Sequence, residues 1–218
     1  MTSPRTLGAI LHEDFELLDL YGPLEMFGSL GADVRIVTVA EQAGPVKSTP
    51  GPRTLAEFDF SGCPPLDLLL LPGGIGTVAQ LGNSAIQGFL RERCPKAEVV
   101  MSVCSGSALL AKAGVLDGRR ATSNKLFFDL ARSQSDAVEW VTEARWVEDG
   151  PYVTSSGVSA GTDMSLAVIE KLFGKDRAAQ VAILTEYEWQ NDPSRDPFTK
   201  YLNRAAEFGP APSGSADA

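Results

Sequence analysis

Residues 98–114 read EVVMSVCSGSALLAKAG, and this stretch predicts a strand, a sharp turn and a helix in direct succession. The apolar run 98–103 is typical of a buried strand, and residues 105–113 are typical of a helix that ends at Gly114. Cys104 falls on the turn between them. Small residues beside a nucleophile permit the sharp turn that projects its side chain outward, so Cys104 is the first candidate for chemistry.

Around this unit, strand-like and helix-like segments alternate along the chain. The predicted strands are residues 7–11, 34–39 and 67–71, and the predicted helices are residues 17–30 and 85–93. The run 67–71 is apolar throughout, which is typical of a strand buried on both faces of a parallel sheet. The alternation predicts an α/β fold with a doubly wound, mostly parallel sheet sandwiched by helices. Ligands are then expected at the carboxyl ends of the strands.

The last third of the chain departs from this alternation. Residues 138–147 and 152–155, separated by Asp149-Gly150, predict a β-hairpin, and residues 160–173 and 177–189 predict two closing helices. Residues 209–218 are Gly, Pro, Ser, Ala and one Asp, which predicts a disordered tail. We find no internal repeat and no long linker, so residues 1–208 are predicted to form a single domain.

Composition excludes several classes of function. The chain has 218 residues and a net charge of −9, and it lacks a basic cluster, which argues against a nucleic-acid partner. No apolar run approaches the roughly 20 residues of a membrane-spanning helix. Residues 1–5 lead straight into a predicted strand, which argues against a signal peptide. We therefore expect a cytoplasmic protein that does not associate with membranes.

The three cysteines and the single histidine predict neither a metal site nor a disulfide framework. Cys63, Cys94 and Cys104 lack metal-ligand spacing, and one histidine makes zinc or non-haem iron chemistry improbable. We interpret Cys63 and Cys94 as structural. A lone histidine is more often a satisfied surface or core group than a catalytic base. The chain therefore offers no Cys–His pair unless His12 reaches Cys104.

The position of Cys104 predicts a reactive thiol. A helix N-terminus beside it would supply partial positive charge and free N–H groups, and both would lower the thiol pKa. The alternative is a buried, inert cysteine at a strand end. Gly73 and Gly74 follow another predicted strand, and their N–H groups, with that of Ser105, could stabilise an anionic intermediate. The alternative for the two glycines is a turn that needs their conformational freedom.

Asp19 lies among Leu17, Leu18 and Leu20, close to the start of a predicted helix. A carboxylate in apolar surroundings is costly unless it is hydrogen-bonded or protonated. The simpler interpretation is an N-cap aspartate, which needs nothing beyond helix N–H groups, and the sequence alone favours it. The same interpretation applies to Asp163.

Motifs in a fixed order carry a family resemblance. They are Leu18-Asp19-Leu20-Tyr21-Gly22-Pro23, Cys63-Pro64-Pro65-Leu66-Asp67, Pro72-Gly73-Gly74, Val103-Cys104-Ser105-Gly106, residues 114–122, residues 157–163 and Glu186-Tyr187. Through them the chain resembles the ThiJ/PfpI superfamily, and within it the isocyanide (isonitrile) hydratase branch. The resemblance implies a flavodoxin-like core related to class I glutamine amidotransferases. It also implies a homodimer that uses neither a metal nor an organic cofactor.

The same resemblance implies roles for individual residues. Cys104 would be the nucleophile, and Asp19 the acid that hydrogen-bonds it and shuttles a proton. The residues implied for the anion pocket are Gly73, Gly74 and Ser105, and those implied for the substrate pocket are Thr122, Ser123 and Val158. One departure is clear. After Ala121-Thr122 the hydratases typically continue Thr-His-Trp, whereas this chain has Ser123-Asn124-Lys125, which bears on substrate preference.

The function implied is hydration of an isonitrile to an N-substituted formamide through a covalent Cys104 thioimidate. An alternative keeps Cys104 but changes the substrate, giving a glyoxalase, deglycase or amidase type of enzyme. Another alternative is a redox-sensing module, since an exposed, low-pKa cysteine oxidises readily to sulfinic acid. The sensor half of a transcription regulator has less support, because it needs a helix-turn-helix of roughly a hundred further residues.

Overall fold

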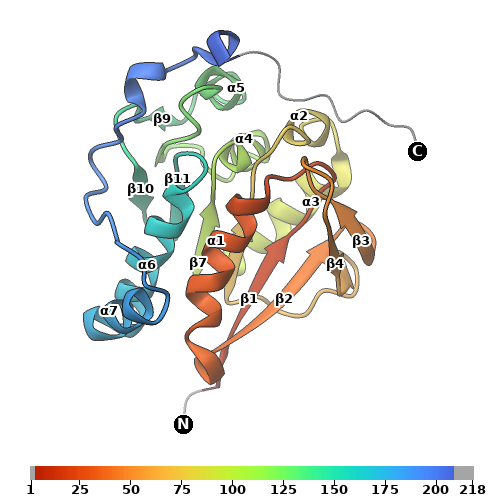
Figure 1. Ribbon diagram of the computed structural model, residues 1–218. Helices are drawn as coiled ribbons and strands as arrows, with labels where there is room; N and C mark the ends of the chain where they lie inside the picture. Colours follow the sequence, from red (N-terminus) through yellow and green to blue (C-terminus); the bar gives the residue numbers. More distant parts are fainter. Residues whose placement is uncertain (1–2, 209–218) are drawn as a thin grey trace.

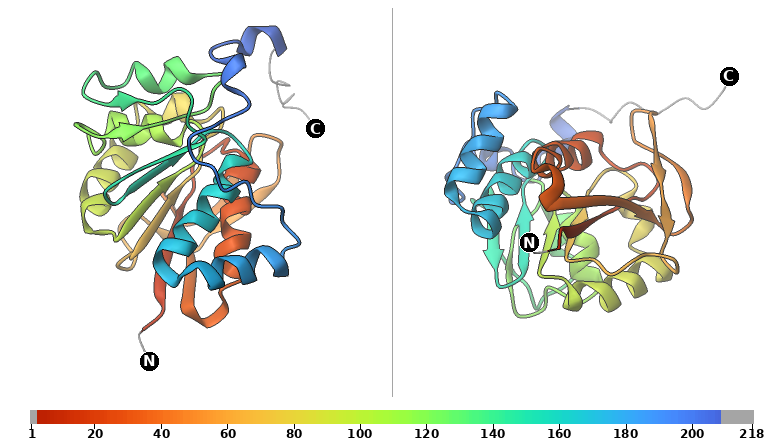
Figure 2. Two further views of the ribbon diagram at one scale, coloured as in Figure 1. Left: turned by 90° about the vertical axis from the view of Figure 1, so that its left-hand side faces the viewer. Right: turned by 90° about the horizontal axis from the view of Figure 1, so that it is seen from below.

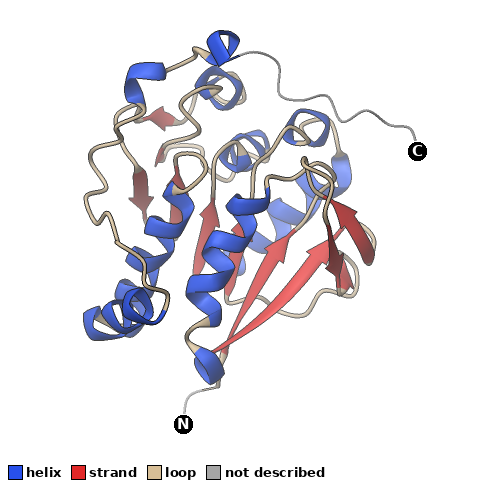
Figure 3. Ribbon diagram, viewed as in Figure 1, coloured by secondary structure: helices blue, strands red, loops and turns tan. Residues whose placement is uncertain are grey.

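The computed structural model describes residues 3–208. Within these residues, the centre of the molecule is a seven-stranded sheet in which all neighbouring strands run parallel except β10, which is antiparallel to β11 (Figures 1 and 3). Across the sheet the strands are β10 (Trp146–Asp149), β11 (Tyr152–Ser155), β7 (Val99–Ser102), β6 (Leu68–Leu71), β1 (Arg5–Ile10), β2 (Val34–Ala40) and β5 (Phe58–Asp59). This is the doubly wound, mostly parallel α/β sheet that the sequence predicts.

Helices cover both faces of the sheet, so the central strands are buried on both sides. Strand β6 is four consecutive leucines, all buried. Leu68 and Leu70 belong to one hydrophobic cluster and Leu69 and Leu71 to the other, because successive side chains of a strand point to opposite faces. Figure 2 shows the two layers of helices. One face carries α1 (Leu17–Gly28), α6 (Ala160–Phe173) and α7 (Lys175–Leu184), and the other carries α3 (Ser84–Arg93) and α4 (Gly106–Lys112).

Shorter elements connect these layers. A two-stranded antiparallel ribbon and a two-stranded parallel pair lie outside the main sheet. The ribbon is β3 (Gly44–Lys47) with β4 (Arg53–Ala56), and the parallel pair is β8 (Arg120–Ala121) with β9 (Glu139–Trp140). The short helices are α2 (Thr77–Gln80), α5 (Phe128–Arg132), and the 3-10 turns η1 (Gly31–Asp33), η2 (Cys94–Lys96), η3 (Thr199–Tyr201) and η4 (Ala205–Phe208).

The predicted hairpin forms, but its first strand is shorter than the sequence indicates. Strand β10 begins at Trp146 and pairs with β11, whereas the residues of β9 pair with β8 instead. The second closing helix also ends early, at Leu184, where the periodicity predicts a helix through residue 189. Beyond the helix, the Trp189 indole donates to the Asp163 carbonyl at 3.0 Å, which ties this segment to α6.

Residues 209–218, for which the sequence predicts a disordered tail, lie outside the described residues. The extent of the single domain, residues 1–208, stays a prediction. Among residues 3–208, none of the helices combines the length and the apolar character that crossing a membrane requires. The same residues include no cluster of three or more His, Cys, Asp or Glu side chains that could hold a metal ion.

Candidate active site

Cys104 lies on the turn that joins β7 to α4, at the carboxyl edge of the sheet. Its φ of 58° lies in the left-handed region, which residues other than glycine rarely adopt. The turn is held by the Cys104 N–H, which donates to the Ser156 carbonyl at 3.3 Å, and by the Gly106 N–H, which donates to the Val103 carbonyl at 3.0 Å. A strained residue on a strand–turn–helix unit is typical of an exposed or functional nucleophile.

The Cys104 thiol is nevertheless buried, with 7% of the residue exposed, and hydrogen-bond donors surround it. Asn124 Nδ2 donates to Cys104 Sγ at 3.0 Å. The Asn124 amide is oriented because its Oδ1 accepts the Phe127 N–H at 3.1 Å, which leaves the NH₂ group facing the sulfur. Ser105, the next residue, acts through its backbone and side chain to lower the pKa of the thiol. These contacts favour a negative charge on the sulfur.

Asp19 lies beside Cys104, and it is not an N-cap. The N-cap of α1 is Glu16, whose side chain makes no capping hydrogen bond, and Asp19 is the third residue of the helix. The Asp19 side chain is fully buried, and its Oδ2 accepts the Gly73 N–H at 2.9 Å. Its Oδ1 has no hydrogen-bond partner among the oxygen and nitrogen atoms of the described residues. The Asp19 carboxyl and the Cys104 thiol each shift the pKa of the other, so the two groups are close neighbours.

Burial dominates the electrostatics of this pair. Desolvation raises the pKa of the Asp19 carboxyl well above its ordinary value, against the hydrogen bond from Gly73. Desolvation, and then the negative charge of Asp19, raise the pKa of the Cys104 thiol well above its ordinary value. The expectation that the helix N-terminus lowers the thiol pKa is therefore wrong for the net effect. Because charging both groups in this buried site is costly, the titrations of the two groups are coupled.

In the predicted anion pocket, the backbone N–H groups of Gly73 and Gly74 donate to side chains of the protein. The Gly73 N–H donates to Asp19, and the Gly74 N–H donates to Ser105 Oγ at 3.1 Å. Ser105 Oγ in turn shares a hydrogen bond of 2.9 Å with Thr77 Oγ1, at the start of α2. Position 73 has no room for a side chain, because a Cβ there would lie 2.5 Å from Ser105 Oγ. Their role toward an anionic intermediate stays a prediction.

Residues 122–125 pack against Cys104 and contact it through Ser123 and Asn124. Thr122 and Ser123 are fully buried, and Ser123 Oγ donates to the Cys104 carbonyl at 3.1 Å. The Thr122 hydroxyl donates to the Val141 carbonyl at 2.7 Å, and so it is engaged with the protein. Val158 is half-buried, directly after Gly157. The assignment of Thr122, Ser123 and Val158 to a substrate pocket remains a prediction.

Asn124 contacts the thiol and is a candidate site residue that the sequence did not predict. The departure at residues 123–125 marks the segment as unusual, but spacing alone cannot show that residue 124 touches residue 104. Gly157 makes this contact possible, because a Cβ there would lie 2.2 Å from Asn124 Nδ2 and 3.2 Å from Cys104 Sγ. The glycine thus leaves room for the amide to approach the sulfur.

Lys125 anchors the same segment from inside the protein. Its side chain is 1% exposed, and Nζ donates to the Ala144 carbonyl at 2.7 Å and to Thr122 Oγ1 at 2.9 Å. The buried Asp196 carboxylate lies 3.9 Å from Nζ. Burial lowers the pKa of Lys125 to about 8, against the attraction of Asp196. Lys125 therefore joins the Asn124 segment to the C-terminal part of the described chain.

Asp163 is not an N-cap either. Its Oδ2 accepts from Arg145 Nε at 2.8 Å, and its Oδ1 accepts from the Tyr187 hydroxyl and the Gln190 N–H, each at 3.0 Å. Burial and the Asp163 charge raise the pKa of Tyr187 to about 12, so this phenol stays a donor. The network is a structural anchor for the segment after α7.

The other candidates lie away from the thiol. Cys63 and Cys94 are both buried, and burial raises the pKa of the Cys94 thiol to about 12, so the structure agrees with an inert cysteine there. His12 makes no hydrogen bond to Cys104 within the described residues. Its ring nitrogens face the Glu13 carbonyl at 3.0 Å and the Pro72 carbonyl at 3.2 Å.

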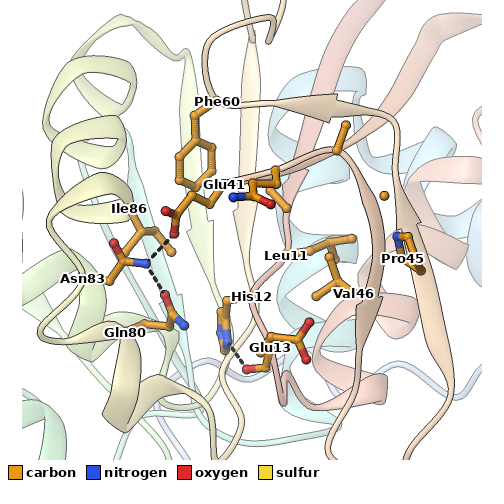
Figure 4. A pocket seen from close by; sticks show the side chains of 14 residues that line it. Leu11, His12, Glu13, Glu41, Pro45, Val46, Phe60, Gln80, Asn83 and Ile86 are labelled. Carbon is orange, nitrogen blue, oxygen red and sulfur yellow. Dashed lines mark hydrogen bonds between the residues drawn. The ribbon is translucent and has the colours of Figure 1, made fainter.

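A pocket of about 430 Å³ opens beside this histidine, at the carboxyl ends of β1 and β2 (Figure 4). Figure 4 shows the His12 ring between Gln80 and Glu13, with Phe60 on the far wall. Cys104 does not line this pocket.

The sequence matches the model of the DJ-1/PfpI family over residues 7–171. The chain belongs to the DJ-1/PfpI family. It is 34% identical to the isonitrile hydratase of Pseudomonas putida over 181 residues, which cover 83% of this chain and 78% of that protein. It is 29% identical to the HTH-type transcriptional regulator CdhR of Pseudomonas aeruginosa, over 73% of this chain and 47% of the regulator.

Solved structures agree with this family. A ThiJ/PfpI family protein from Pseudomonas syringae superposes with a TM-score of 0.81 at 32% identity, over 94% of this chain and 84% of that one. Drosophila melanogaster DJ-1beta superposes with a TM-score of 0.76 at 21% identity, over 85% of this chain and all of that one, which shows the shared fold. The resemblance seen in the sequence motifs is thus confirmed at the level of family and fold.

Proposed function

We propose that this protein is an isonitrile hydratase that converts an isonitrile and water to an N-substituted formamide. The observation that carries the proposal is the buried pair of Cys104 and Asp19, whose titrations are coupled, with Asn124 donating to the sulfur. The similarity to the hydratase of Pseudomonas putida supports the choice of substrate class. The reaction needs a nucleophile and one group that gives and takes protons, and this pair provides both.

The first step forms the covalent intermediate. With the shared proton on Asp19, the Cys104 thiolate attacks the terminal carbon of R–N≡C, and an S–C bond forms. The Asp19 carboxyl delivers its proton to the same carbon, which gives the thioimidate R–N=CH–S and leaves Asp19 as a carboxylate. The raised pKa of Asp19 favours the protonated acid that this step needs.

The second step releases the product. Asp19 takes a proton from water as the oxygen attacks the thioimidate carbon, and it passes this proton to the nitrogen. When the C–S bond breaks, Asp19 accepts the hydroxyl proton and the formamide R–NH–CHO leaves. Cys104 departs as a thiolate, which the hydrogen bond from Asn124 stabilises. The state from which the attack began, with the proton on Asp19 and a thiolate on Cys104, is restored.

The burial of Cys104 also favours this substrate class. An exposure of 7% leaves little room around the sulfur for a bulky electrophile. The reactive carbon of an isonitrile is terminal and stands at the end of a linear C≡N–R group. Such a carbon can reach a recessed thiol while the R group stays outside.

The experiment that tests the proposal is turnover of p-nitrophenyl isocyanide, followed by ultraviolet absorbance, with Cys104→Ala as the matched variant. We expect the parent to form the N-formyl product and Cys104→Ala to lose at least a thousandfold in rate, as nucleophile removal does in covalent catalysis. Parent protein that alkylates readily at Cys104 but hydrates no isonitrile would refute the proposal. Formation of lactate from methylglyoxal would then support the glyoxalase alternative.

The proposal includes a cytoplasmic homodimer, as the resemblance implies. Light scattering coupled to size-exclusion chromatography measures the mass in solution. A mass of twice the chain supports the dimer, and the mass of one chain rejects it.

A further inference from the structure

His12 is buried, with 4% of its surface exposed, and the proposed reaction does not use it. It is also the one histidine of the chain. Its Nε2 lies 3.2 Å from the Pro72 carbonyl oxygen, and its Nδ1 lies 3.0 Å from the Glu13 carbonyl oxygen. Because both neighbours are acceptors, each contact is a hydrogen bond when the facing nitrogen carries a proton.

The Pro72 carbonyl belongs to the same peptide group as the Gly73 N–H. That N–H donates to Asp19 Oδ2 at 2.9 Å. The peptide is therefore hydrogen-bonded at both ends, to the histidine on one side and to the proposed acid on the other. The Gly73 carbonyl also accepts the Glu16 N–H at 2.8 Å, so the turn is held on both flanks.

We propose that His12 is a positioning residue, which donates from Nε2 to the Pro72 carbonyl and thereby holds the Gly73 N–H on Asp19. The inference rests on the proposed role of Asp19 as the proton carrier. A hydrogen bond accepted by a peptide carbonyl polarises the peptide and strengthens donation by its N–H. His12 thus favours the carboxylate form of Asp19 without touching substrate, thiol or acid.

The surroundings of the ring agree with this role. The charged groups that act on it are acidic: Glu13 and Asp14 follow it in the chain. Glu41 lines the same pocket, where it accepts a hydrogen bond from Asn83 (Figure 4). Burial lowers the pKa of His12 despite these charges and the two carbonyl contacts. A neutral ring has a single N–H, so the proposal requires the tautomer with the proton on Nε2.

The single histidine permits a direct test in the parent protein. Imidazole ¹⁵N NMR of histidine-labelled protein reports one ring, and we expect a protonated Nε2 and a bare Nδ1 at neutral pH. The opposite tautomer, with a bare Nε2 facing the Pro72 carbonyl, would overturn the proposal. This measurement needs no substrate, so it succeeds or fails independently of the hydratase assignment.

Two variants test the consequence for Asp19. His12→Gln keeps an amide nitrogen near the position of Nε2, whereas His12→Asn is shorter and loses the Pro72 contact. In a Cys104→Ala background, infrared titration of the Asp19 carboxyl is expected to show a pKa higher by roughly 0.5 to 1 for His12→Asn than for His12→Gln. Equal pKa values in the two folded variants would overturn the proposal.

Activity supplies the last readout. With Cys104 present, His12→Asn is expected to lower kcat/KM for p-nitrophenyl isocyanide by about fivefold, the effect of one net hydrogen bond. His12→Gln should restore it to within about twofold of the parent. The control is Gln42→Ala, which borders the same pocket and should change nothing. A loss shared by Gln42→Ala would point to the pocket itself and overturn the proposed path through Pro72.

Discussion

Two buried aspartates on helices that pack against each other, Asp19 on α1 and Asp163 on α6, have opposite surroundings. Both Asp163 oxygens accept hydrogen bonds, and Arg145 neutralises the charge. Asp19 has one backbone donor on Oδ2, no cation, and an Oδ1 without an oxygen or nitrogen partner in the described part of the chain. Both are aspartates in the first turn of a helix, so the difference between them comes from the groups that surround each carboxyl.

Hydrogen-bond partners and a neighbouring cation distinguish a structural carboxylate from one that can carry a proton. A buried carboxylate with every acceptor satisfied and a cation beside it stays charged and stabilises the fold, and removing its partners is costly. A buried carboxylate with a bare oxygen beside a thiol has a raised pKa, and its free oxygen can hold a proton. The first belongs to the packing of α6, and the second to the chemistry of Cys104.

The largest effect is expected for Asp19→Asn. The amide keeps the shape of the side chain but cannot shuttle a proton, so kcat/KM for p-nitrophenyl isocyanide should fall by about 10²–10⁴. Steady-state kinetics measure this loss, with Asp163→Asn assayed alongside and expressed per folded molecule. Full activity of Asp19→Asn would remove the proton-transfer role.

Asp163→Asn should show the opposite pattern, a large loss of stability with little change in the activity of the folded molecules. It leaves Arg145 buried without its counter-charge, so the free energy of unfolding should fall by about 3–5 kcal/mol. Urea unfolding measures it, and Asp19→Asn should change the same quantity by less than about 1 kcal/mol. Equal destabilisation by both variants would erase the distinction drawn between the two sites.

Asn124→Ala tests the contribution of the hydrogen bond that the Cys104 sulfur accepts. It removes the Nδ2 hydrogen bond to the sulfur, and a hydrogen bond to a charged group contributes about 1.5–3 kcal/mol, so kcat/KM should fall by about 10–100-fold. The apparent pKa of Cys104, followed by the pH dependence of its alkylation, should rise, because the thiolate loses a donor. Asn191→Ala, on an exposed residue, is the matched control. An unchanged alkylation profile would contradict the contact.

Lys125 gives a smaller, pH-dependent effect. Its pKa is about 8 in the folded protein and near 10.5 when unfolded, so the unfolded chain binds more protons between these values. The cost of burying the charge is therefore present below pH 8 and is relieved as the pH rises toward 10.5. Urea unfolding at pH 7.5 and 9.5 should show this gain in the parent relative to Lys125→Met. An identical pH dependence in both would mean that Lys125 is not buried as a cation.

The sequence predicts the fold and the turn that carries Cys104 well, because both depend on local patterns. The structures of the all-leucine β6 and of the turn after Cys104 are determined by residues that are close together in the sequence. The N-cap interpretations of Asp19 and Asp163 fail because burial and partners come from distant segments, Gly73 in one case and Arg145 in the other. Asn124 was beyond sequence reasoning for the same reason. Its contact with Cys104 exists only once residues 122–125 fold back across the turn.

The most direct test of the central claim is the protonation state of Asp19 in the resting protein. Infrared difference spectra of the parent and Asp19→Asn at pH 7 isolate the carbonyl stretch of a protonated carboxyl group. We predict that this carbonyl band is present in the parent and in Asp163→Asn and is absent in Asp19→Asn. Absence of such a band at pH 7, with Asp19 fully ionised beside a neutral Cys104 thiol, would contradict it.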